Sequence, residues 1–103
     1  MAQSEVIEIL KKYILLLKSE GIVVDKAFLF GSYLLNTASE ESDIDLMIVT
    51  ENEHDDYLAG KVWALTNKIN TKIEPFLIGR NKFNSVENSP LVQMIKSKGL
   101  EIV

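Results

Sequence analysis

The 103-residue sequence predicts an α/β (α+β) fold, a small mixed sheet with helices packed on it. Apolar residues recur at helical spacing near the start of the chain, and three short apolar runs further on have the length of strands. Apolar residues make up 47% of the chain and charged residues 25%, which is typical of a globular protein and argues against disorder. Because a chain of this length can form one modest core, we expect one domain over residues 1–103.

The first third of the chain predicts a helix followed by a strand. Residues 4–20 have helical apolar spacing, with Ser4 as the expected N-cap and Gly21 as the residue after the last turn. Residues 22–30 predict a strand that ends at Gly31. We expect a short helix or turn next, and then the polar loop "NTASEES".

The middle of the chain predicts a strand, a helix and another strand. Residues 43–50 are apolar on both faces after Asp45, as a central strand would be. Residues 55–69 predict a helix, and residues 71–78 predict a strand. Since Pro75 cannot donate a backbone hydrogen bond, this last strand is expected at an edge of the sheet or locally bulged.

The C-terminal segment predicts one more helix and a short last strand, "LEIV". Ser89 suits the N-cap of this helix, Pro90 its first position and Gly99 its end. The apolar runs are too short to span a membrane, and the N-terminus lacks the basic-then-apolar order of a signal peptide. The chain has no cysteine, which excludes disulfides and thiolate chemistry, so we expect a cytoplasmic protein.

Two carboxylates stand at the head of the second predicted strand. Asp43 and Asp45 are two residues apart, so both side chains point to the same face of a strand. Their Cα atoms should lie roughly 6–7 Å apart, which allows both to approach one or two divalent cations. Carboxylate oxygens are ligands that suit Mg²⁺ or Mn²⁺. Two surface residues at a strand mouth would give the same pattern, so the pair alone decides little.

A Gly-Ser dipeptide eleven residues before the pair adds a second signal. Gly31 follows a strand and allows the backbone to turn closely around a phosphate, to which Ser32 can offer its hydroxyl and its N–H. At average composition, this dipeptide at a fixed distance before Asp-x-Asp arises by chance in roughly one such chain in a thousand. The combination therefore favours a site for a metal ion and a nucleotide.

The segment "LFGSYLLNTASEESDIDLMIV" resembles the GS-x10-DxD signature of the nucleotidyltransferase superfamily typified by DNA polymerase beta. Over nearly its whole length the chain is similar to the smallest members, the minimal nucleotidyltransferases. The resemblance implies that Asp43 and Asp45 bind Mg²⁺ (or Mn²⁺) and that Gly31 and Ser32 hold the phosphates of ATP. It also implies a third carboxylate on a later strand, which matches Glu74 as a metal ligand and as the base or orienter of the attacking hydroxyl.

The sequence departs from the family pattern directly after the Gly-Ser. Many members continue with roughly R-A-R-G, where this chain has "YLLN", so an expected charged phosphate contact is missing. Asn36 stands where glycine is usual, and asparagine tolerates the left-handed conformation better than most residues. Arg80, the only arginine, and Lys82 are alternative phosphate or partner contacts, although a solvated loop explains them equally simply.

Three further side chains have ordinary interpretations. His54, the only histidine, lies in a polar stretch and is expected at the surface. Tyr57 and Trp63 have helical spacing, which favours core or interface packing over base stacking. The helix over residues 4–20 is apolar nearly all round, so a second copy of the chain can cover part of it in a homo-oligomer.

The resemblance implies transfer of AMP from ATP to a hydroxyl of a partner protein. Minimal nucleotidyltransferases are commonly antitoxins paired with a HEPN-domain toxin, and the product would be an adenylylated, silenced ribonuclease. A net charge of −4 argues against a stand-alone nucleic-acid binder and suits a basic protein partner. The alternatives are a non-catalytic antitoxin that masks its toxin, and transfer to a small molecule such as an aminoglycoside, for which 103 residues leave little room. In a further alternative the motif is a coincidence in an ordinary α/β domain.

Overall fold

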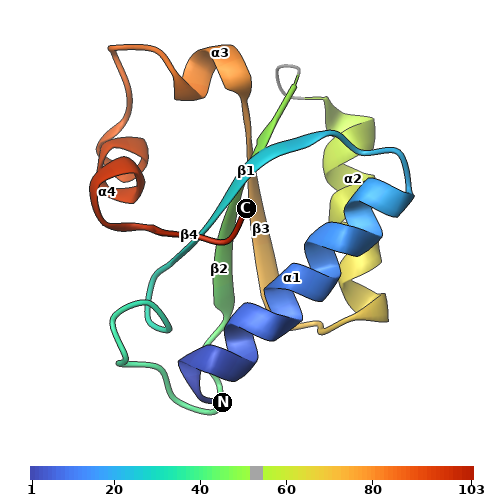
Figure 1. Ribbon diagram of the computed structural model, residues 1–103, viewed down its shortest axis with the longest axis vertical. Helices are drawn as coiled ribbons and strands as arrows, with labels where there is room; N and C mark the ends of the chain where they lie inside the picture. The colour runs from blue at the N-terminus through green and yellow to red at the C-terminus, as the bar shows by residue number, and fades with distance from the viewer. Residues whose placement is uncertain (52–54) are drawn as a thin grey trace.

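The computed structural model describes residues 1–51 and 55–103, and shows a four-stranded sheet with helices on both faces (Figure 1). In chain order the described elements are α1 (Gln3–Ser19), β1 (Val24–Phe30), β2 (Ile44–Thr50), α2 (Asp56–Leu65), the 3-10 turn η1 (Thr66–Lys68), β3 (Ile73–Gly79), α3 (Arg80–Phe83), α4 (Pro90–Lys98) and β4 (Leu100–Glu101). The predicted mixed α/β fold is confirmed. Among the described residues, no helix is both long enough and apolar enough to cross a membrane.

The sheet is mixed, and its strand order is β3-β2-β1-β4. β1 pairs antiparallel with β2 and β4, whereas β2 and β3 run parallel. The central position predicted for residues 43–50 is confirmed, because β2 lies between β1 and β3. The edge position predicted from Pro75 is confirmed as well, since β3 ends the sheet on that side.

Two clusters of buried apolar side chains hold the layers together. α1 and α2 cover one face of the sheet, and α3 and α4 cover the other (Figure 1). Alternate residues of β2 serve the two faces: Ile44, Leu46 and Ile48 belong to the cluster under α1 and α2, and Met47 and Val49 to the other. A strand that is buried on both faces must be apolar at successive positions, which is the pattern that its sequence shows.

The ends of the helices follow the predicted capping residues, with one exception. The prediction of Ser4 as an N-cap is wrong, because α1 already begins at Gln3. The N-cap is Ala2, and its N–H donates a hydrogen bond of 3.4 Å to the Glu5 side chain in the first turn. Gly21 follows α1 with a φ of 81°, as expected, and Ser89 Oγ accepts from the N–H of Val92 at the start of α4.

The region after β3 contains an element that the sequence did not indicate. α3 spans only four residues, and its last residue, Phe83, is buried. The Phe83 ring stacks on Phe28 of β1 with 5.5 Å between ring centroids. Because a contact with a distant strand stabilises this short helix, local spacing could not reveal it.

A buried tyrosine links the two helices that lie on one face. Tyr13 of α1 is fully buried, and its hydroxyl donates a hydrogen bond of 2.5 Å to the carbonyl oxygen of Val62 in α2. Burial raises the pKa of Tyr13 well above its ordinary value, so the hydroxyl remains a neutral donor. This bond therefore fixes α2, and with it the residues α2 places beside β3.

We expect Tyr13→Phe to lower the free energy of unfolding by about 1–2 kcal/mol, because a buried hydrogen bond to the Val62 carbonyl is lost. Urea unfolding with an unchanged m-value is the measurement. Tyr57→Phe removes the same hydroxyl from a side chain that is 79% exposed and should leave the midpoint unchanged. Equal stability of the two variants would contradict the role given to the Tyr13 hydroxyl.

Candidate active site

One end of the sheet brings the predicted site residues into a row across three strands. The register pairs Phe30 of β1 with Asp45 of β2, and Asp45 with Glu74 of β3. Neighbouring strands are about 4.8 Å apart, so Asp45 and Glu74 are direct neighbours on one face. Asp43, two residues before Asp45, extends the row on the same side, and Gly31 follows Phe30. The structure thus places Gly31, Asp43, Asp45 and Glu74 together.

Gly31 allows the Asp45 carboxylate to approach the backbone closely. Its φ is 75°, in the region that favours glycine. A Cβ at this position would lie 3.0 Å from Cγ of Asp45 and closer still to Oδ2. Any side chain at residue 31 would therefore displace the Asp45 carboxylate, and the Gly-Ser signal has a structural explanation beside the predicted phosphate contact.

The turn after Gly31 is anchored to the core by packing. Backbone bonds from Leu35 N–H to the Gly31 oxygen (3.2 Å) and from Thr37 N–H to the Ser32 oxygen (2.9 Å) close it. Tyr33 is 3% exposed, and Gln3 Nε2 donates to its carbonyl oxygen at 3.0 Å. In the "YLLN" segment, the position where the family pattern has its first arginine thus holds a core aromatic side chain.

Asn36 ends this turn in the left-handed conformation, with a φ of 57°. Asparagine was expected to tolerate such a conformation where glycine is usual, and the backbone confirms it. Ser32 is half-buried at the start of the turn. Its contact with a phosphate remains a prediction.

Burial and neighbouring negative charge raise the pKa of two carboxylates in the cluster. Burial, followed by the negative charge of Asp43, raises the pKa of Asp45. Partial burial also raises the pKa of Glu74, and the hydrogen bond and charge of Asp43 and the charge of Asp45 raise it further. Burial contributes most to each shift and negative charge adds to it, and a bound divalent ion would oppose both shifts.

The donor set fits a hard divalent cation, because every ligand in the row is a carboxylate oxygen. Among the described residues, no three His, Cys, Asp or Glu side chains are already arranged as a complete metal-binding group. Mg²⁺ commonly takes only one or two protein carboxylates and completes its shell with water and substrate phosphates. Metal binding by Asp43, Asp45 and Glu74 therefore stays a prediction that the chemistry of the site supports.

Arg80 and Lys82 lie at the other end of the sheet. Gly79 pairs with Thr50 at the far end of β2 from Asp45, and Arg80 follows it. The Arg80 guanidinium forms a two-pronged ion pair with Asp25 of β1, in which Nη2 lies 2.7 Å from Oδ1. The structure thus gives Arg80 a structural partner and does not bring it to the carboxylates.

A hollow of about 230 Å³ lies beside the carboxylates, and two of the residues that line it were not expected there from the sequence. Trp63 and Lys72 line it together with Asp43 and Glu74. The Lys72 Nζ donates to the carbonyl oxygen of Glu40, and its own carbonyl accepts from the N–H of Ile44 at 2.8 Å. Only the parallel register of β2 and β3 places Lys72 next to Asp43.

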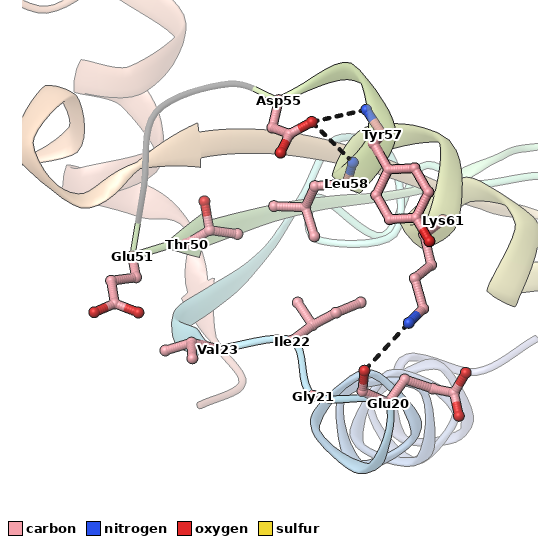
Figure 2. A pocket seen from close by; sticks show the side chains of 10 residues that line it. All are labelled: Glu20, Gly21, Ile22, Val23, Thr50, Glu51, Asp55, Tyr57, Leu58 and Lys61. Atoms are coloured by element: carbon pink, nitrogen blue, oxygen red, sulfur yellow. Dashed lines mark hydrogen bonds between the residues drawn. The ribbon is translucent and has the colours of Figure 1, made fainter.

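Of the core or interface packing predicted for Trp63 and Tyr57, the core alternative is wrong, because both side chains are exposed, by 47% and 79%, and interface packing stays a prediction. Tyr57 lies at the opposite end of α2 from Trp63, in a hollow of about 340 Å³ (Figure 2). There Lys61 Nζ donates to the Glu20 carbonyl oxygen, 3.3 Å away, and Thr50 at the end of β2 lines the same hollow. The prediction for His54 falls outside the described residues.

The family comparison agrees with the geometry. A family model described as a nucleotidyltransferase domain matches residues 6–99, which is nearly the whole chain. The chain therefore belongs to the nucleotidyltransferase domain family, and nucleotidyl transfer is the class of reaction that this membership supports. No curated protein matches the sequence.

Solved structures extend the likeness at the level of the fold. A proposed nucleotidyltransferase from Sulfolobus solfataricus has a TM-score of 0.59 at 15% identity, over 79% of this chain and 73% of that one. A toxin–antitoxin structure with AMP-PNP has a TM-score of 0.60 at 19% identity, over 100% and 73%. A mutant of the toxin–antitoxin MntA–HpeT has a TM-score of 0.58 at 16% identity, also over 100% and 73%.

We predict that Gly31→Ala weakens binding of Mg²⁺ and an ATP analogue, because the new Cβ displaces the Asp45 carboxylate. Gly21→Ala is the matched control, since Gly21 has a φ of 81° and nothing within 4 Å of an added Cβ. Both variants should lose about 1–2 kcal/mol of stability from left-handed strain. In calorimetric titrations Gly31→Ala alone should lose affinity; equal affinities in both variants would contradict the contact.

We expect Arg80→Met to melt at a lower temperature than the wild type at pH 7 and to bind Mg²⁺ and ATP normally. The Arg80 hydrogen bond lowers the pKa of Asp25 in the folded protein. The resulting stabilisation is present above the unfolded pKa of aspartate and is lost as the pH falls through the lowered folded value. Melting curves of the two proteins should therefore converge on acidification to about pH 2. A constant difference at all pH values would show that the ion pair is not its source.

Proposed function

We propose that the protein is a Mg²⁺-dependent nucleotidyltransferase that transfers AMP from ATP to a hydroxyl of a partner protein. The observation that carries the proposal is the row in which Asp45 lies between the Gly31 turn and Glu74, with Asp43 beside them. The Gly31 turn lies on one side of the paired carboxylates, and Glu74 lies on the other. This arrangement suits the alignment of two substrates, one on each side. Family membership supports the reaction class.

In the proposed reaction, the Gly31–Ser32 turn holds the triphosphate and the Glu74 side receives the acceptor. The acceptor oxygen attacks the α-phosphorus of ATP, the new O–P bond forms, and the bond from the α-phosphorus to the bridging oxygen breaks. Pyrophosphate leaves with the bonding electrons, and the hydroxyl proton passes to the Glu74 carboxylate and then to water. Asp43 and Asp45 would hold a divalent cation, which when bound would supply charge stabilisation for the phosphoryl oxygens.

A HEPN-type ribonuclease toxin is the proposed acceptor, and the protein is then its cytoplasmic antitoxin. The resemblance to minimal nucleotidyltransferases and the fold shared with two toxin–antitoxin structures, one of them with AMP-PNP, support this assignment. The net charge of −4 suits a basic protein partner and disfavours direct nucleic-acid binding. Attachment of AMP to a hydroxyl would add a charged, bulky group to the toxin and silence it.

A non-catalytic antitoxin that masks its toxin is the second candidate. The "YLLN" segment supports this alternative, because Tyr33 is buried in the core at a position where the family pattern carries an arginine. The close packing of Asp45 against Gly31 argues for the enzyme instead, because binding by simple coverage requires no such contact.

Incubation with α-labelled ATP, Mg²⁺ and the protein encoded by the adjacent gene tests the enzyme. We expect label on the partner, and we expect Asp43→Asn/Asp45→Asn to reduce the transfer rate by about a thousandfold or more. Glu101→Gln, which removes an exposed negative charge from β4, should retain full activity. Omission of Mg²⁺ or addition of a chelator should abolish transfer. Toxin neutralisation that survives the double substitution, with no label transferred by the wild type, would support masking.

A further inference from the structure

The strand order leaves one side of the carboxylate row open. Gly31 flanks Asp45 on the β1 side, and Glu74 flanks it on the β3 side. Since β3 is the edge of the sheet, no strand of the described part continues beyond Glu74. If the triphosphate lies on the Gly31 side, the β3 edge is the side of the row left for the second substrate.

Two hollows meet on this edge, and Trp63 belongs to the lining of both. The first, about 230 Å³, also includes Asp43, Lys72 and Glu74. The second, about 280 Å³, includes Pro75 and its neighbours Phe76 and Leu77 on β3, together with Ala59 of α2. The first is charged, whereas the second is mainly apolar. Together they lead from the carboxylates along the edge of β3, with Trp63 between them.

Trp63 is a large aromatic side chain that lies on the exposed side of α2. In α2, Val62 is fully buried and Leu65 is 6% exposed, while Trp63 is 47% exposed. Neither cluster of buried side chains found in the described residues includes Trp63. A half-exposed tryptophan beside an apolar hollow is the kind of side chain that dominates the binding energy of protein interfaces. Its position therefore calls for an external partner.

We propose that Trp63 contacts the acceptor: its indole packs on a polypeptide segment that carries the accepting hydroxyl and lies along the β3 edge. This inference rests on the proposed function. The apolar hollow extends away from the carboxylates along β3, and it is larger than a hydroxyl group alone requires. It therefore suits an apolar side chain of the acceptor that neighbours the residue with the accepting hydroxyl. The base of ATP would instead follow its phosphates to the Gly31 side. Trp63 thus selects the acceptor, while the carboxylates act on it.

Steady-state kinetics with the adjacent-gene product as acceptor tests this role. We expect Trp63→Ala to raise KM for the acceptor about tenfold or more, with KM for ATP and kcat at saturation within about twofold of wild type. Trp63→Phe should recover most of the loss, because it restores an aromatic face. Tyr57→Ala removes the other exposed aromatic of α2, at the end away from the carboxylates, and should change neither constant.

The protein's single tryptophan gives a second, independent readout. Its fluorescence should shift when the acceptor is added and stay constant with Mg²⁺ and an ATP analogue alone. A shift produced by the analogue alone, or a changed KM for ATP in Trp63→Ala, would overturn the assignment in favour of base contact. An unchanged acceptor KM in Trp63→Ala, with an active wild type, would overturn this inference alone. An inactive wild type would instead overturn the proposed function.

Discussion

The crowding of like charges at one end of the sheet is the constraint on which the rest of the structure depends. Asp43, Asp45 and Glu74 are held together by strand pairing, and burial and mutual repulsion raise the pKa of Asp45 and Glu74. Because like charges brought close together repel one another, the fold that holds them must be stabilised elsewhere. Two apolar clusters on the two faces of β2, and the Arg80–Asp25 ion pair at the opposite end, provide that stability.

The turn that supports this charged row is built from packing. Close approach of Asp45 to the backbone requires glycine at residue 31, and the chain then turns with Tyr33 inserted into the core and Asn36 in a left-handed conformation. Gln3, from the start of α1, ties the turn to the helix through the Tyr33 carbonyl. The segment that replaces the family's arginine pattern therefore makes the turn rigid without adding positive charge.

Local patterns were sufficient for most of the fold, and the site's principal residues were predicted because their signal is local too. A run that is apolar on both faces placed β2 and Pro75 placed β3, and the spacing of Gly31, Asp43 and Asp45 is a property of one continuous segment. What could not be predicted depends on contacts between distant segments. Lys72 meets Asp43 only through the parallel register, and α3 depends on a ring contact with β1. The choice between core and interface packing for Trp63 could not be made from the sequence, because helical spacing gives a direction without showing what lies opposite the side chain.

Pro75 has a consequence for how the protein avoids pairing with itself. The N–H of Ile44 donates to the Lys72 oxygen, so the alternation along β3 directs the nitrogen of Pro75 away from β2. The outer edge thus lacks a donor near its middle, and another strand cannot extend the sheet there with a complete ladder. An open edge that could form a full ladder would favour aggregation. The proposed acceptor would contact this edge through its side chains and would not extend the sheet through its backbone.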